Sequence, residues 1–167
     1  MLKRCSLFVL LVLVAAAVAQ DSKPNFSGAW QLVVEKSDFG QPTPWGPRFP
    51  AGVTAQSTVI EHRDGKIKMR IKVQTPEGET AQERSYSTDG VETTDTIHGV
   101  PATSRVRWDG RDLVTEVAME FDQEHIYTAV ITARWRLSDD GTTLTNERTM
   151  KHAGGETKQK LVFVKKT

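Results

Sequence analysis

The chain has 167 residues, with 22 basic and 21 acidic side chains, a length that favours a single domain. The near balance of charge argues against a nucleic-acid-binding protein, which usually carries a basic excess on one face. The sequence contains no phosphate-binding loop, dinucleotide fingerprint or Gly-x-Ser-x-Gly frame, so it gives no support to those enzyme classes.

The first 19 residues have the three-part layout of a secretory signal peptide. Two cations give a positive start, an uncharged apolar run follows over residues 7–18, and residues 17–19 (AVA) supply the small residues of a cleavage site. The apolar run is well short of the roughly 20 residues that span a bilayer. We therefore expect cleavage after Ala19, a mature domain over residues 20–167, and a secreted or periplasmic protein without stable membrane insertion.

The only cysteine, Cys5, precedes the apolar run, whereas the acceptor cysteine of a lipoprotein would follow it. The expected mature domain therefore contains no cysteine and must be held together by its hydrophobic core. Two of the 22 basic side chains also lie in the leader, which leaves 20 against 21 acidic ones. No residue pattern in the chain indicates a metal or a cofactor.

Alternation with period two dominates the expected mature chain. Residues 66–73 (KIKMRIKV) alternate four cations with four apolar residues, and similar patterns occur over 113–120 and 127–137. Successive side chains of a strand point to opposite faces, so these runs predict strands with one buried and one solvated face. Asp-Gly and related dipeptides between the runs supply the turn residues that tight hairpins require.

The sequence thus predicts an all-β domain with no helix. Serial hairpins indicate an antiparallel up-and-down meander, and closure into a barrel of 8–10 strands removes its exposed edges. A sandwich is the alternative, because alternation does not distinguish closure from stacking. The predicted strands lie near residues 28–36, 54–63, 66–74, 79–88, 91–97, 102–109, 112–121, 125–137 and 143–152, with a tenth near 157–165.

Residues 26–30 (FSGAW) open the first predicted strand. This segment resembles the Gly-x-Trp signature of lipocalins and related calycin barrels, and the whole layout is similar to lipocalin-like domains of secreted bacterial proteins. The resemblance implies a cup-shaped barrel that binds a small, often hydrophobic molecule, with structural roles for Gly28 and for Trp30 at the closed end. Lipocalins usually stack an arginine from the last strand on this tryptophan. Here that strand offers only lysines, which lack the planar guanidinium.

Residues 38–52 differ from the rest of the domain. Four prolines and three glycines exclude a helix or a central strand there. A loop of this length is functional or disordered, and its aromatic residues favour an ordered flap. We expect Trp45 and Phe49 to lie at the mouth of the barrel.

Several aromatic side chains are predicted to point into the barrel, where they either line a pocket or pack as plain core. Arg84 has the same strand parity as one of them, Tyr86, and an inward arginine needs an anionic partner. Arg105 and Arg107 are predicted to point outward. The candidate ligand-binding residues are Trp45, Phe49, Arg84, Tyr86, Trp108, Tyr127 and Trp135.

The leading hypothesis is a barrel that binds a small molecule. One alternative is a small hydrolase or isomerase with a histidine or carboxylate at the rim. Another is an envelope interaction module with a filled barrel and an exposed aromatic patch. No catalytic residue is assigned, because the histidines lack metal-ligand spacing such as His-x-His and fit solvated turn positions better. They are His62, His98, His125 and His152.

Overall fold

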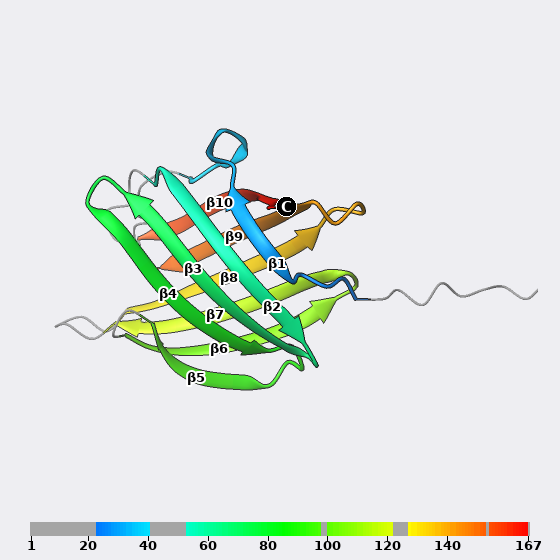
Figure 1. The fold of residues 1–167 in the computed structure, drawn as a ribbon. Coiled ribbons are helices and arrows are strands. Elements are labelled where there is room, and N and C mark those ends of the chain that lie inside the picture. Colours follow the sequence, from blue (N-terminus) through cyan, green and yellow to red (C-terminus); the bar gives the residue numbers. More distant parts are fainter. Residues whose placement is uncertain (1–22, 41–52, 98–99, 122–126, 153, 167) are drawn as a thin grey trace, which may run out of the picture.

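The computed structural model describes residues 23–40, 53–97, 100–121, 127–152 and 154–166, with the side chains of Phe121 and Tyr127 excepted. This part of the chain forms ten strands and one turn of 3-10 helix, η1 (Val34–Lys36) (Figure 1). The strands are β1 (Gly28–Leu32), β2 (Ala55–Arg63), β3 (Lys66–Thr75), β4 (Gly78–Ser87), β5 (Glu92–Ile97), β6 (Val100–Asp109), β7 (Asp112–Phe121), β8 (Tyr127–Leu137), β9 (Thr143–His152) and β10 (Gly155–Lys165).

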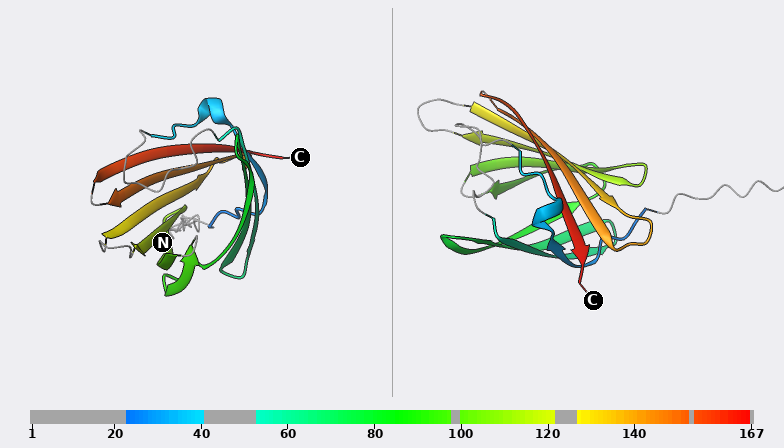
Figure 2. Two further views of the ribbon diagram at one scale, coloured as in Figure 1. Left: turned by 90° about the vertical axis from the view of Figure 1, so that its left-hand side faces the viewer. Right: turned by 90° about the horizontal axis from the view of Figure 1, so that it is seen from above.

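All ten strands belong to one antiparallel sheet in the order β4-β3-β2-β1-β10-β9-β8-β7-β6-β5. The sheet curls on itself, so the strands surround a common axis when viewed end-on (Figure 2). The predicted up-and-down barrel is therefore confirmed, and a sandwich of two sheets is excluded by the continuous ladder. No ladder joins β4 to β5, and β4 lies against β6 at this seam, so the barrel is nearly closed.

The predicted strands all form, and the differences lie at their ends. The first strand stops at Leu32 and not at residue 36, because the chain turns away through η1 after Val33 donates a hydrogen bond to the carbonyl of Val162. It then returns to β10, where Asp38 and Lys160 exchange two backbone hydrogen bonds of 2.7 Å. Within the described residues the predicted absence of α-helix is correct, and η1 is a single short turn.

The hairpin between β2 and β3 shows how local chemistry sets the register. Arg63 pairs with Lys66, which leaves a two-residue loop of Asp64 (φ 52°) and Gly65 (φ 70°). Positive φ at both positions matches the turn whose twist suits a hairpin, and aspartate and glycine tolerate it. The register then turns the apolar set of β3 into the barrel and its four cations to solvent.

One end of the barrel is filled by a core around Trp30, whose side chain is fully buried. Its indole N–H donates to the Phe26 carbonyl at 2.9 Å, and the Lys165 ammonium lies 5.4 Å from the ring centroid. A Cβ on Gly28 would lie 2.7 Å from Lys165 Cε, so the glycine makes room for the lysine that covers the tryptophan. Lysine thus takes the place above Trp30 as a point charge without the planar stacking.

The residues before β1 close the same end. Phe26, His62 and Trp108 form a stacked triangle with ring centroids 5.8–6.0 Å apart. Ser27 fastens this segment to β2, because its hydroxyl accepts from the His62 amide at 2.9 Å and donates to the His62 carbonyl at 3.2 Å. The larger buried core cluster contains Phe26 and Trp30 and extends along the barrel as far as the cavity. It consists of Phe26, Trp30, Leu32, Val53, Ile60, Ile67, Met69, Val73, Val106, Leu113, Leu144, Leu161 and Phe163.

In the part of the chain that the structure covers, no helix has the length and apolar character needed to cross a membrane.

Replacing Trp30 with phenylalanine would remove volume from this core and leave the Phe26 carbonyl without its donor. We expect the free energy of unfolding to fall by about 2–4 kcal/mol, measured by urea denaturation and circular dichroism. The control is Val59→Ala on the solvated face of β2, where the change should stay within about 1 kcal/mol. Equal stability of the two variants would contradict the structural role of Trp30.

His62 should make the stability of the closed end depend on pH. Burial lowers the pKa of His62 below its ordinary value of 6.5, and its Nδ1 accepts a hydrogen bond from the Phe26 amide. The unfolded chain therefore binds the proton more tightly than the folded one. The stability that neutral His62 contributes is complete above the unfolded pKa and declines as the pH falls through the lowered pKa.

Urea denaturation of the parent and of His62→Phe at several pH values between about 5 and 7.5 tests this. Phenylalanine keeps a ring against Phe26 and Trp108 but cannot titrate. The parent should lose more stability than the variant as the pH falls, and parallel pH profiles would show that His62 is not responsible.

Candidate functional site: a cavity in the hollow half of the barrel

A cavity of about 250 Å³ occupies the half of the barrel away from the Trp30 core. Single strands run through both halves of the barrel. Strand β10 contributes Thr157 to the cavity and Phe163 to the core, and β9 contributes Met150 to the cavity and Leu144 to the core. Most of the wall is apolar, and its apolar residues come from five strands, β3, β5, β7, β8 and β9. These residues are Met69, Ile71, Val73, Ile97, Val117, Met119, Ile131, Ala133, Trp135 and Met150.

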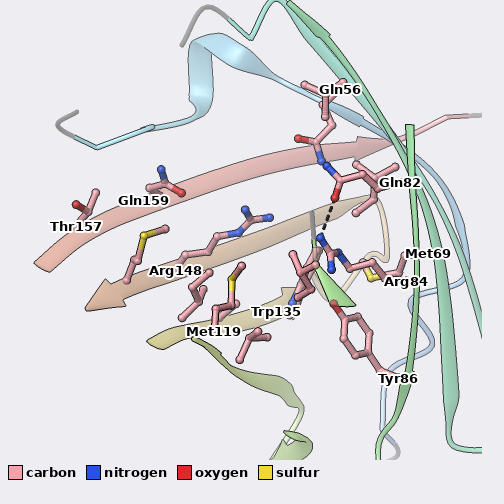
Figure 3. A pocket seen from close by; sticks show the side chains of 17 residues that line it. Gln56, Met69, Gln82, Arg84, Tyr86, Met119, Trp135, Arg148, Thr157 and Gln159 are labelled. Atoms are coloured by element: carbon pink, nitrogen blue, oxygen red, sulfur yellow. Dashed lines mark hydrogen bonds between the residues drawn. The ribbon is translucent and has the colours of Figure 1, made fainter. Parts of the chain in front are cut away.

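A polar belt interrupts this wall, and its charged members are two arginines on opposite sides of the barrel. Arg84 extends from β4 and Arg148 from β9, and both point into the cavity (Figure 3). Tyr86 lies two positions after Arg84 on the same strand face. None of the described residues that line the cavity carries a carboxylate. The remaining polar lining residues are Gln56, Gln82, Thr157 and Gln159.

Each arginine is oriented by a neutral amide two residues earlier on its own strand. Arg84 Nη2 donates to Gln82 Oε1 at 2.9 Å, and Arg148 Nε donates to Asn146 Oδ1 at 2.8 Å. Asn146 is completely buried, and its Nδ2 is the one buried side-chain nitrogen or oxygen in the described residues that has no hydrogen-bond partner. These hydrogen bonds orient the two guanidinium groups within the cavity.

The electrostatics of the belt reflect burial inside the barrel wall. Burial lowers the pKa of Arg148 to about 10, with a smaller lowering from the charge of Arg84 and an opposing effect of Tyr86. Burial also raises the pKa of the Tyr86 hydroxyl, against the effect of the two arginines. Tyr86 is therefore a neutral hydrogen-bonding group beside two cations at physiological pH. The cavity combines an apolar wall with a site of positive charge.

The structure brings three of the seven candidate ligand-binding residues together: Arg84, Tyr86 and Trp135 line the cavity. Trp108 points inward but lies at the closed end against Phe26 and His62, outside the cavity lining. The other three candidates lie outside the described parts: Trp45 and Phe49 fall within residues 41–52, and the structure describes the backbone of Tyr127 but not its side chain.

Arg148, its partner Asn146 and the methionines of the cavity were not among the sequence candidates. The inward positions of β9 read Leu144, Asn146, Arg148 and Met150, and the outward positions between them are also polar. A strand that is polar on both faces shows no alternation of apolar and polar residues, so only its pairing with β8 and β10 determines which side chains point inward. Counting every second residue from the apolar Leu144 is the one sequence signal that would have placed Arg148 inside the barrel.

The structure does not gather the described histidines at one rim. His62 belongs to the closed end, whereas His152 ends β9 at the opposite end of the barrel. His98 and His125 lie outside the described residues. Within the described parts of the chain no group of histidine, cysteine, aspartate and glutamate side chains is arranged to hold a metal ion.

No protein-family model and no curated protein sequence matches this chain. Solved structures match it through their fold. Lipid binding protein 8 of Caenorhabditis elegans has 14% identity and a TM-score of 0.54, over 84% of this chain and 95% of that one. Zebrafish ileal bile acid-binding protein, complexed with cholic acid, has 14% identity and a TM-score of 0.53, over 84% and 98% of the chains.

Secretory abundant heat soluble protein 4 from Ramazzottius varieornatus matches with 18% identity and a TM-score of 0.51, over 85% of this chain and 95% of that one. At such identities the likeness concerns the fold alone. The chain therefore shares the barrel fold of these proteins, and it spans almost the whole length of each of them.

The hydrogen bond between half-buried Arg148 and buried Asn146 should cost stability in the absence of a ligand. Arg148→Met alone leaves the Asn146 amide fully unpaired, whereas Arg148→Met with Asn146→Leu replaces both partners by apolar groups. We expect the double variant to exceed the single variant by about 1–3 kcal/mol in the free energy of unfolding and to equal or exceed the parent. Urea denaturation measures this, and a double variant less stable than the single one would contradict it.

Proposed function

We propose that the barrel binds one small amphipathic molecule, with an anionic group at Arg84, Arg148 and Tyr86 and an apolar body against the surrounding wall. One observation carries the proposal: two arginines enter a cavity whose described lining is otherwise neutral and mostly apolar. Inward-facing cations in a mostly apolar wall cost desolvation free energy, and charge-assisted hydrogen bonds to an anionic ligand group offset such a cost.

An anion would reverse this cost. A carboxylate or a similar oxyanion forms charge-assisted hydrogen bonds with guanidinium groups, and these are stronger than the bonds to the amides of Gln82 and Asn146. The Tyr86 hydroxyl adds a further donor, because its raised pKa keeps it protonated. The amides hold the arginines in position before binding, which reduces the ordering cost of the complex.

The size of the cavity limits the enclosed part of the ligand. A water molecule occupies about 30 Å³ in the liquid, so 250 Å³ corresponds to a body of roughly eight to twelve non-hydrogen atoms. Trp135 and Tyr86 supply flat apolar surfaces and the methionines supply flexible ones. These dimensions suit a medium-chain or aromatic acid.

The fold comparisons support the same class of ligand. Two of the proteins with this fold are a lipid-binding protein and a bile acid-binding protein, the latter in complex with cholic acid. The interaction-module hypothesis required a filled barrel, whereas the described barrel contains a cavity. No arrangement of described residues favours the enzyme alternative.

We further propose that the protein acts outside the cytoplasm, on the basis of the N-terminal layout. If so, N-terminal sequencing of the protein recovered from the periplasm or the medium should begin at Gln20. A protein that keeps its first 19 residues and stays with the cytoplasmic fraction would contradict export.

Ligands with one apolar chain and different head groups test the proposed chemistry. We expect decanoate to bind the purified protein at least about tenfold more tightly than 1-decanol, and decylamine to bind weakest, since only the carboxylate pairs with the guanidiniums. Isothermal titration calorimetry at fixed ionic strength gives the three affinities. Equal binding of the acid and the alcohol would contradict an anion site.

Variants locate the site. Arg84→Met and Arg148→Met should each weaken decanoate binding by about tenfold or more and leave 1-decanol binding nearly unchanged. The matched control is Arg70→Met, which removes an arginine on the outer face of β3 that is paired with Glu61. Loss of decanoate binding in the control, or its survival in both cavity variants, would place the site elsewhere.

A further inference from the structure

The sulfur-containing side chains of the described residues all lie in the cavity wall. The protein has four methionines and one cysteine, and Met1 and Cys5 lie outside the described residues. The other three methionines, Met69, Met119 and Met150, all line the cavity. They come from β3, β7 and β9, which are not neighbours in the sheet, so no local sequence pattern explains why they converge.

These thioethers are placed beside the proposed anion site. Met150 follows Arg148 by two positions on β9, so the two side chains point to the same face of the strand. Met69 pairs with Arg84 across β3 and β4. Met119 projects into the same cavity from β7 below Arg148 (Figure 3). Leucine would fill similar volume, but a thioether also accepts an oxygen atom from a two-electron oxidant.

We propose that oxidation of these three methionines is a switch that releases the anionic ligand, an inference that rests on the proposed function. Hydrogen peroxide transfers one oxygen atom to the thioether sulfur, which becomes a sulfoxide, while the peroxide is reduced to water. Each event turns a flexible apolar wall residue into a polar one with a strong hydrogen-bond acceptor. A sulfoxide at Met150 or Met69 accepts a hydrogen bond from the neighbouring guanidinium and so competes with the ligand oxyanion.

The two effects act in the same direction. The apolar body of the ligand loses wall area, and its head group loses part of the positive charge that holds it. In the complex, a sulfoxide oxygen that faces the apolar chain of the ligand is buried without a hydrogen-bond partner, which makes the binding free energy less favourable. Because methionine sulfoxide is reduced back by dedicated reductases, the switch is reversible in principle.

The experiment compares ligand binding before and after oxidation. The purified protein is treated with hydrogen peroxide, freed of oxidant, and titrated with decanoate, while peptide mass spectrometry counts oxygen atoms at each methionine. We expect all three methionines to be oxidised, decanoate affinity to fall by about tenfold or more, and bound decanoate to slow the oxidation. Treatment with methionine sulfoxide reductases should restore binding.

The control is the triple variant Met69→Leu, Met119→Leu and Met150→Leu, which keeps the volume of the wall but has no thioether in it. Its decanoate affinity before treatment serves as its own baseline, and peroxide should leave that affinity unchanged. Should the volume change impair folding, single leucine variants serve, each retaining a graded part of the response. Peroxide sensitivity that persists in the triple variant would overturn the proposal, because the damage would then lie elsewhere.

The outcomes separate this proposal from the one on which it rests. If the untreated protein fails to bind decanoate, the proposed anion-binding function is wrong, and so is the oxidation switch that depends on it. If untreated protein binds and the fully oxidised protein binds equally well, or if the methionines resist peroxide that oxidises free methionine, only the switch is wrong.

Discussion

The packing of Trp30 at one end of the barrel is the constraint from which the rest of the interior follows. A ten-stranded barrel encloses more space than its inward side chains can fill over the whole height. Here large residues gather at one end, where Trp30 lies under Lys165 and hydrogen-bonds to Phe26. The other half encloses the cavity, where side chains can serve a purpose other than close packing.

The hollow half adds a different kind of residue to the branched and aromatic side chains that it shares with the core. It contains three methionines and several long polar side chains, and its two arginines hydrogen-bond to amides on their own strands. Such residues pack poorly but adapt to a guest and orient it.

Sequence alone predicted the parts of the structure that depend on local patterns. Strict alternation located β3, Asp64-Gly65 located its hairpin, and the Gly-x-Trp segment located the closed end. Sequence did not predict what depends on register across strands. Arg148 lies on a strand that is polar on both faces, and the unpaired seam between β4 and β5 follows from how the whole sheet curls. The position of Trp108 at the closed end depends in the same way on its contacts with Phe26 and His62, which lie far away in sequence.

The two faces of the barrel treat positive charge differently, and the difference bears on function. Outside, arginines pair with carboxylates of neighbouring strands, as in Arg70 with Glu61 at 2.6 Å and Arg107 with Glu116 at 3.3 Å. In solvent such pairs are worth little, and a missing partner costs little. Inside, the described cavity lining offers amide oxygens to the two arginines, from Gln82 and from the neighbouring Asn146, and it contains no carboxylate. Because a cation costs more to bury beside apolar side chains than to expose to solvent, the two arginines mark the part of the interior whose chemistry apolar packing does not explain.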